Sequence, residues 1–258
     1  INAGTVENSG VEFLISYRDQ FSENFNFNTS FNFTTINNNV TYVGNLAGFE
    51  QGGGFGVGTG IVTSRMEAGH SLGYFYGYKT NGIYQNQGEI DVLNAGATSN
   101  ENIYHTGAGV GDLRFVDTNG DGYISEVDKT DIGDPIADIT AGLNLGFSYK
   151  KIDFSAAAIG SFGNNMVRDY QRFNLLANKS ERLVNRWTPT NPSNTIPRAS
   201  SGASINTDLF SDYFVEDASF VRIQNIQVGY TFDKLALDRI SVDSLRLFLS
   251  ANNLHTFT

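Results

Sequence analysis

Strict alternation of apolar and polar side chains is the feature that most constrains how this chain can fold. Between Ile139 and Tyr149 every second residue is apolar, and the residues between them are Thr, Gly, Asn and Ser. A period of two residues places successive side chains on opposite faces of a β-strand, so each such run predicts a strand with one apolar and one polar face. The predicted antiparallel strands are Val11–Tyr17, Phe25–Phe33, Ile139–Tyr149, Ile152–Phe162, Ile226–Phe232 and Leu245–Asn252.

A soluble β-sandwich and a transmembrane β-barrel both produce this alternation, and three features favour the barrel. The strands are roughly ten residues long, as a tilted bilayer crossing requires. Their polar faces carry mostly small, uncharged side chains, which suit a wet lumen. Short connections (Asp19–Asn24, Tyr149–Lys151 and Asp233–Asp243) alternate with long ones (Asn37–Thr59, Thr80–Asp138 and Gly163–Asp212). The sequence therefore predicts an all-β fold, part of a large transmembrane antiparallel β-barrel with long extracellular loops, and leaves a soluble β-fold as the alternative.

Composition excludes several classes of function. The net charge of −10 argues against nucleic acid as a partner, because phosphate binding needs a basic surface. The absence of cysteine excludes disulfides, thiolate metal sites and cysteine nucleophiles. No apolar run is long enough for a transmembrane helix. His70, His105 and His255 have neither metal-ligand spacing nor a triad motif, so we predict no catalytic residues and no enzyme.

Aromatic residues gather at predicted strand ends: Tyr74, Phe75, Tyr76 and Tyr78, then Phe147 and Tyr149, then Tyr230 and Phe232. Such a group forms an interfacial girdle in a membrane barrel, where amphipathic rings lie at the level of the lipid headgroups. The same group forms an ordinary apolar core in any β-protein. The sequence leaves both interpretations open. No shift of composition marks a domain boundary along the chain.

The segment DTNGDGYISEVD has the spacing of a calcium-binding loop. Ca²⁺ takes hard oxygen ligands at alternate positions of a twelve-residue loop, with glycine at the sixth position for a sharp turn. Gly122 occupies that sixth position. The predicted ligands are Asp117, Asn119, Asp121, Tyr123 through its carbonyl, Ser125 and Asp128. Asp128 stands where a helical EF-hand has a bidentate Glu, so we expect a weak structural Ca²⁺ site. The alternative is a loop of Asx turns without an ion.

Several longer blocks resemble one protein family. GYFYGYKTNGIYQ and GDLRFVDTNGDGYISEVDKTDIGDP resemble signature blocks of the SusC/RagA-type TonB-linked (TonB-dependent) outer-membrane transporters. RWTPTNPSNTIPR, DYFVEDASFVRIQNIQVGYTF and LRLFLSANNLHTFT follow in the order of that family. INAGTVENSGVEFLISY resembles an earlier strand of the family. The resemblance covers essentially the whole chain and points to the C-terminal barrel region.

The resemblance implies a barrel of about 22 strands that encloses a plug domain. Residues 1–258 are then a partial barrel, with the plug and the final strands outside this chain. The implied function is TonB-energised uptake of glycans or oligopeptides across the outer membrane of a Gram-negative bacterium of the Bacteroidota type. The implied partners are a SusD-like surface lipoprotein, outer-membrane lipids, and TonB–ExbB–ExbD through an N-terminal part that this chain lacks.

Two other functions fit the same residues. A SusC-like barrel could serve as a subunit of another surface assembly, for secretion or adhesion, and its sequence blocks would look the same. A soluble, calcium-stabilised glycan-binding β module would share the alternation and the Asp117–Asp128 loop. Substrate-binding residues are unknown at this stage, because lumen and loop positions that choose a ligand follow no general code.

Overall fold

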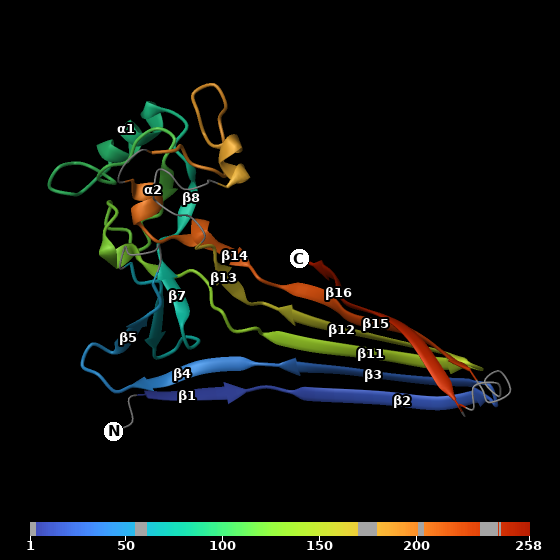
Figure 1. Ribbon diagram of the computed structural model, residues 1–258. Coiled ribbons are helices and arrows are strands. Elements are labelled where there is room, and N and C mark those ends of the chain that lie inside the picture. The colour runs from blue at the N-terminus through green and yellow to red at the C-terminus, as the bar shows by residue number, and fades with distance from the viewer. Residues whose placement is uncertain (1–3, 55–60, 170–179, 201–203, 233–241, 243) are drawn as a thin grey trace. The chain divides into compact units, whose positions relative to one another are not determined.

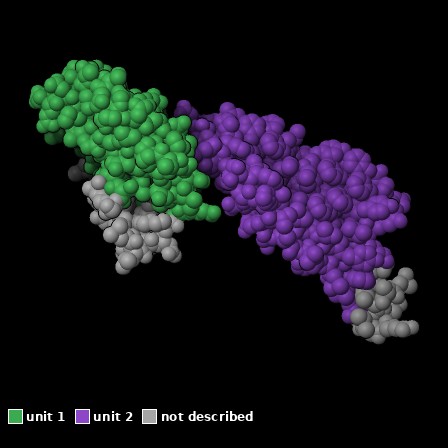
Figure 2. Space-filling model, turned by 90° about the horizontal axis from the view of Figure 1, so that it is seen from above, with its two compact units in different colours: residues 1–7, 39–135, 165–216 green, residues 8–38, 136–164, 217–258 purple. Residues whose placement is uncertain are grey.

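The computed structural model describes residues 4–54, 61–169, 180–200, 204–232, 242 and 244–258. The chain divides into two compact units, which Figure 2 shows in different colours. Unit 1 comprises residues 1–7, 39–135 and 165–216, and unit 2 comprises residues 8–38, 136–164 and 217–258. Each unit is thus assembled from three separate stretches of sequence.

Unit 2 contains one antiparallel sheet of six long strands, which lie side by side in Figure 1. Their spatial order is β16 (Leu245–Phe257), β15 (Phe220–Phe232), β12 (Ile152–Phe162), β11 (Ile139–Tyr149), β3 (Phe25–Thr35) and β2 (Glu12–Ser22). The all-β class and all six predicted strands are confirmed, and β11 and β12 have the predicted bounds. A two-residue turn joins these two strands, with Lys150 at a φ of 55°. The predicted connection Asp233–Asp243 lies outside the described residues, apart from Val242.

The register of the sheet aligns the apolar residues in rows across the strands. Phe27 lies opposite Phe147, which lies opposite Phe154. The rings of Phe147 and Phe154 stack with centroids 5.0 Å apart. The same row continues through Val228 and Leu249. Cross-strand pairs of this kind stabilise a sheet, and a slip of one residue would move every apolar side chain to the other face.

These apolar rows remain exposed in the chain. Leu143 keeps 37% of its surface accessible and Leu249 keeps 80%. A soluble sandwich would bury such side chains against a second sheet. Apart from the ends of a two-stranded sheet, residues 8–9 and 37–38, the described residues of unit 2 contain no other sheet.

Strand β15 extends beyond the predicted segment because a bulge changes the phase of its alternation. Ala157 of β12 pairs with Asn225, and Ala158 pairs with Ile223, so Gln224 is the extra residue. The shift keeps Ile223 on the same face as Ile226 although the two are an odd number of positions apart. A bulge leaves one residue unpaired and bends the strand. Strict period-two counting therefore stops at the bulge, while the strand continues to Phe220.

Polar side chains link the strands on the opposite face. Asn144 of β11 donates to Ser30 of β3 through its amide nitrogen, with a distance of 3.3 Å to the hydroxyl. Arg246 of β16 reaches Asp153 of β12 with two nitrogens, across the intervening strand. Gly229 makes this possible, since a Cβ there would lie 2.5 Å from Oδ1 of Asp153.

Unit 1 is built from short elements. The structure places a two-stranded sheet of β1 (Gly4–Ser9) and β4 (Asn37–Val43) at its start, and both strands continue into unit 2. A four-stranded sheet has the order β10 (Thr130–Asp131), β7 (Tyr74–Gly77), β6 (Ser64–Glu67) and β5 (Phe49–Gly52). Two further pairs are β8 (Thr80–Ile83) with β9 (Leu113–Phe115), and β13 (Asn165–Val167) with β14 (Val215–Asp217). The helical segments are α1 (Gln87–Ala95), α2 (Ile205–Asp208) and the 3₁₀ turns η1 (Glu126–Asp128), η2 (Glu181–Asn185) and η3 (Asp212–Phe214).

The aromatic group at Tyr74–Tyr78 forms core and not a surface girdle. Tyr74 is 1% exposed and Tyr78 is 3% exposed. Tyr78 packs with Ile83, Leu113, Phe115 and Trp187 in one buried cluster. Phe75, Phe210 and Phe214 form another. The predicted long loops thus fold around aromatic cores of their own. Among the described residues, no helix is long and apolar enough to cross a membrane.

Candidate functional site

The predicted calcium loop lies in unit 1, between β9 and β10, and ends in the turn η1. Asp117, Asp121 and Asp128 each offer one carboxylate oxygen, and these oxygens all lie within 4.8 Å of one another. The loop therefore brings together all three carboxylates that the spacing predicted as ligands.

Backbone N–H groups hold two of these carboxylates in place. Asp117 accepts from Gly120 at 2.6 Å through Oδ1 and from Gly122 at 2.7 Å through Oδ2. Asp128 accepts from Thr118 at 2.9 Å and from Ser125 at 2.8 Å. Oδ1 of Asp117 also accepts from the Asp121 N–H at 3.2 Å, and Oδ1 of Asp128 also accepts from the Asn119 N–H at 3.4 Å. These bonds orient the groups, and the Oδ2 atom of each, with one bond apiece, keeps acceptor capacity for a cation.

The middle of the loop is a tight Asx arrangement. The Asn119 amide donates to Asp121 at 2.9 Å, and the Asp121 N–H donates to Oδ1 of Asn119 at 2.9 Å. Gly122 has a φ of +88°, and a Cβ there would lie 2.9 Å from Oγ1 of Thr98. Thr98 in turn donates its hydroxyl hydrogen to the Asp121 carbonyl. Glycine is thus required at the sixth position by both its backbone conformation and its close neighbour.

The donor set fits a hard divalent cation. Asp128 is fully buried, and none of the three carboxylates forms an ion pair with a basic residue in the described part of the chain. Clustered carboxylates repel one another unless a cation lies among them. Ser125 adds a buried hydroxyl that has no hydrogen-bond partner among the described residues. Calcium prefers several oxygen ligands of this kind around a sharp turn.

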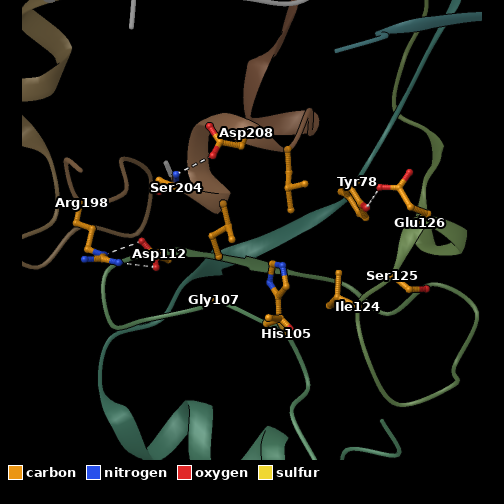
Figure 3. Close-up of a pocket in the computed structure, with 13 residues that line it drawn as sticks. Tyr78, His105, Gly107, Asp112, Ile124, Ser125, Glu126, Arg198, Ser204 and Asp208 are labelled. Carbon is orange, nitrogen blue, oxygen red and sulfur yellow. Dashed lines mark hydrogen bonds and ion pairs between the residues drawn. The ribbon is translucent and has the colours of Figure 1, made fainter. Parts of the chain in front are cut away.

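A cavity of about 620 Å³ adjoins this loop, and no motif in the sequence predicted it. Figure 3 shows that it is lined from several directions, by the His105–Gly107 segment, the start of η1, the α2 segment and Arg198. All its lining residues belong to unit 1.

His105 forms one wall of the cavity and is 8% exposed. Its ring meets Phe115 edge-on, with centroids 4.9 Å apart. Burial lowers the pKa of His105 to about 4, and the nearby Asp112 charge offsets this only in part. The imidazole is therefore neutral at physiological pH. Its Nδ1 is buried and has no hydrogen-bond partner among the described residues.

Asp112 is the most heavily hydrogen-bonded carboxylate at the cavity and is 1% exposed. It accepts from Nε of Arg198 at 2.7 Å and from Nη2 at 2.9 Å. The amide of Asn206 adds a bond of 2.7 Å, and the Gly109 N–H adds one of 2.9 Å. The hydrogen bond to Asp112 raises the pKa of Arg198. This cluster joins residues 86 and 94 positions apart, so no local spacing could have revealed it.

At the edge of the cavity, Glu126 connects the calcium loop to the aromatic core. It accepts a hydrogen bond of 3.1 Å from the Tyr78 hydroxyl, and it pairs with the Lys129 ammonium. The hydrogen bond from Lys129 lowers the pKa of Glu126. Burial raises the pKa of Tyr78, so its hydroxyl stays protonated and donates.

Comparison with known proteins identifies the relatives of this chain. No protein-family model matches it. TonB-dependent receptor P3 of Formosa agariphila is 30% identical over 260 residues, which cover 100% of this chain and 25% of that protein. TonB-dependent receptor SusC of Bacteroides thetaiotaomicron is 31% identical over 236 residues, which cover 91% of this chain and 21% of SusC. The chain is related to the SusC-type TonB-dependent receptors.

The fold agrees with this relationship. The RagAB peptide transporter superposes with a TM-score of 0.72 at 22% identity, over 99% of this chain and 26% of that one. The RagAB peptide importer in its open-open state gives a TM-score of 0.71 at 21% identity, with the same coverage. The resemblance to SusC/RagA-type receptors is thus confirmed. The chain spans about a quarter of the length of the relatives it matches, and these relatives are named as receptors and transporters, not as enzymes.

Proposed function

We propose that this chain is barrel wall and extracellular loop of a SusC-like transporter in the outer membrane of a Bacteroidota-type bacterium. The observation that carries the proposal is the similarity to TonB-dependent receptors over the whole chain. The exposed apolar rows of unit 2 support it, because lipid solvates such a face and water does not. Strands β3, β11 and β12 have 11 residues each, enough for a tilted bilayer crossing.

The transported substrate belongs to the glycans or oligopeptides. A SusD-like surface lipoprotein captures it, and TonB–ExbB–ExbD supplies the energy through the part of the protein that carries the plug. The relationship to SusC and the fold similarity to the RagAB peptide importer support this assignment. The aromatic cores of unit 1 give the predicted extracellular loops a defined shape for such a partner.

The Asp117–Asp128 loop holds one structural Ca²⁺. Asp117, Asp121 and Asp128 provide carboxylate oxygens, and Asn119, Ser125 and the Tyr123 carbonyl complete the set. The convergence of the three carboxylates supports this proposal. The ion neutralises their mutual repulsion and keeps the loop in one conformation, and it takes no part in chemistry.

Three measurements on the native host test the transport proposal. The protein should fractionate with the outer membrane and require detergent for extraction. A surface lipoprotein should co-purify with it. Deletion of its gene should abolish growth on a glycan or peptide source that the wild type uses. Recovery of the protein from the soluble fraction would refute the membrane assignment, and unchanged growth on every glycan and peptide source would favour a role in another surface assembly.

A further inference from the structure

The cavity beside His105 has no part in the proposals above. It is large enough for a small organic group, and its walls combine apolar side chains with carboxylates. Ile124, Ile205 and Leu209 contribute the apolar surface. A pocket with apolar walls and a few convergent polar groups is the usual form of a small-molecule site.

The charges at the cavity disfavour an anionic ligand. Asp112, Glu126 and Asp208 line it, with Arg198 as the opposing charge, so the lining carries an excess of two negative charges. Arg198 is already held by Asp112 through two nitrogens. A phosphate or carboxylate would therefore meet repulsion, and no unengaged guanidinium of the lining would receive it.

One carboxylate of the lining has no ion-pair partner among the described residues. Asp112 pairs with Arg198, and Glu126 pairs with Lys129. Asp208 forms no ion pair with any residue that the structure describes, and accepts only from the Ser204 N–H and the Thr207 hydroxyl. It is exposed, so a ligand can reach it. Figure 3 shows Asp208 and His105 on opposite sides of the cavity.

The remaining polar groups accept a cation. His105 is neutral and adds no positive charge, and its buried Nδ1 lacks a partner. The cavity wall formed by Glu126 and Tyr78 already binds an ammonium group. Nζ of Lys129 contacts Glu126 and lies 5.3 Å from the centre of the Tyr78 ring. The Tyr78 ring itself is buried and offers no flat platform for a sugar.

We propose that this cavity binds an aliphatic primary ammonium group, with the charge near Asp208 and the hydrocarbon stem between Ile205, Leu209 and Ile124. A lysine side chain carries this group on a hydrocarbon stem, and the amino terminus of a peptide carries a primary ammonium group beside its first side chain. The inference rests on the cavity alone, and it stands or falls independently of TonB-driven transport.

The test is to measure, by calorimetry, the binding of small amines to the full-length protein in detergent. Butylamine should bind about tenfold more tightly than butyrate or butan-1-ol, which have the same number of carbon atoms and lack its positive charge. Asp208→Asn should weaken butylamine binding about fivefold. The matched control is Asp91→Asn, because Asp91 is an exposed carboxylate of α1 outside the cavity, and this variant should bind like the wild type. Equal binding of butyrate or butan-1-ol, or an unchanged affinity in Asp208→Asn, overturns the proposal.

A second variant guards against a folding defect, since Asp208 also accepts from Ser204 at the start of α2. Glu126→Gln removes the carboxylate that neutralises the Lys129 ammonium beside the cavity. The positive charge then left unpaired should weaken butylamine binding, and an unchanged affinity in this variant overturns the proposal. Two further probes distinguish the sources of the amine. Nα-acetyl-lysine amide carries only the side-chain ammonium, and alanyl-alanine amide carries only the terminal one. Binding of either supports the site and identifies the source, whereas binding of neither overturns the proposal.

Discussion

Replacement of Asp112 by alanine should open the loop that contains Arg198. The substitution removes four hydrogen bonds: two from Arg198, one from Asn206 and one from the Gly109 N–H. Removing one partner of a buried ion pair costs roughly 3–5 kcal/mol. The Arg198 side chain is 42% exposed and can be solvated, which reduces the cost. The buried amide nitrogen of Asn206 loses its hydrogen-bond acceptor, so we expect a loss of about 3 kcal/mol.

The assay is hydrogen–deuterium exchange of the segment from Trp187 to Arg198. The Arg198 N–H donates to the Gly111 carbonyl at 2.7 Å, and the Trp187 N–H donates to the Ile196 carbonyl at 2.9 Å, so both amides report on opening. A loss of about 3 kcal/mol corresponds to roughly a hundredfold faster exchange, if these amides exchange through local opening.

Asp91→Ala is the control, because Asp91 is exposed and accepts one hydrogen bond from Gln87 within its own helix. Its exchange in this segment should match the wild type. Wild-type exchange in Asp112→Ala would refute the reasoning, since it would mean that the carboxylate does not hold the loop closed.

Three further predictions concern the sheet, the calcium loop and the buried histidine. Leu143→Arg should lower the free energy of unfolding in lipid vesicles by roughly 2–4 kcal/mol, whereas Asn144→Arg on the polar face should lower it less. Equal losses for the two variants in a urea titration would contradict the lipid-facing assignment. Gly122→Ala should strain the loop by about 1–3 kcal/mol and weaken Ca²⁺ binding in a titration at millimolar Ca²⁺, whereas Gly48→Ala, at a positive φ with open space around it, should leave the affinity unchanged. The pKa of His105 falls to about 4 on folding, from an unfolded value of 6.5, so the unfolded chain binds more protons between these values. The contribution of neutral His105 to the free energy of unfolding is therefore fully present above pH 6.5 and is lost as the pH falls toward 4. Pulse proteolysis should show this loss in the wild type and a smaller loss in His105→Gln.

The sequence by itself determined the long strands. In β11 the alternation runs without a break to the turn at Lys150, and in β12 it runs from Ile152 to Ala156 before Ala157 and Ile159 interrupt it. A period of two residues is a local property, because it depends only on the side of the pleat to which each side chain points. The calcium-loop spacing is equally local, which is why it predicted that Asp117, Asp121 and Asp128 would lie together.

Where local patterns break or give no signal, the tertiary structure determined the outcome. The bulge at Gln224 hid the first part of β15, because it changes which positions face the apolar side. The aromatic residues at Tyr74–Tyr78 were equally compatible with a girdle and with a core, and only packing against distant segments made them core. Burial depends on which segments meet, and the sequence around a residue does not contain that information.

The cavity and its charges were decided entirely by such distant contacts. Asp112 and Arg198 are 86 positions apart, and neither lies in a motif that requires the other. The surroundings of His105 lower its pKa only once the chain has enclosed it. Alternation and loop spacing act between near neighbours and can be recognised in the sequence, whereas a desolvated charge pair or a neutral histidine exists only after folding excludes water from the group.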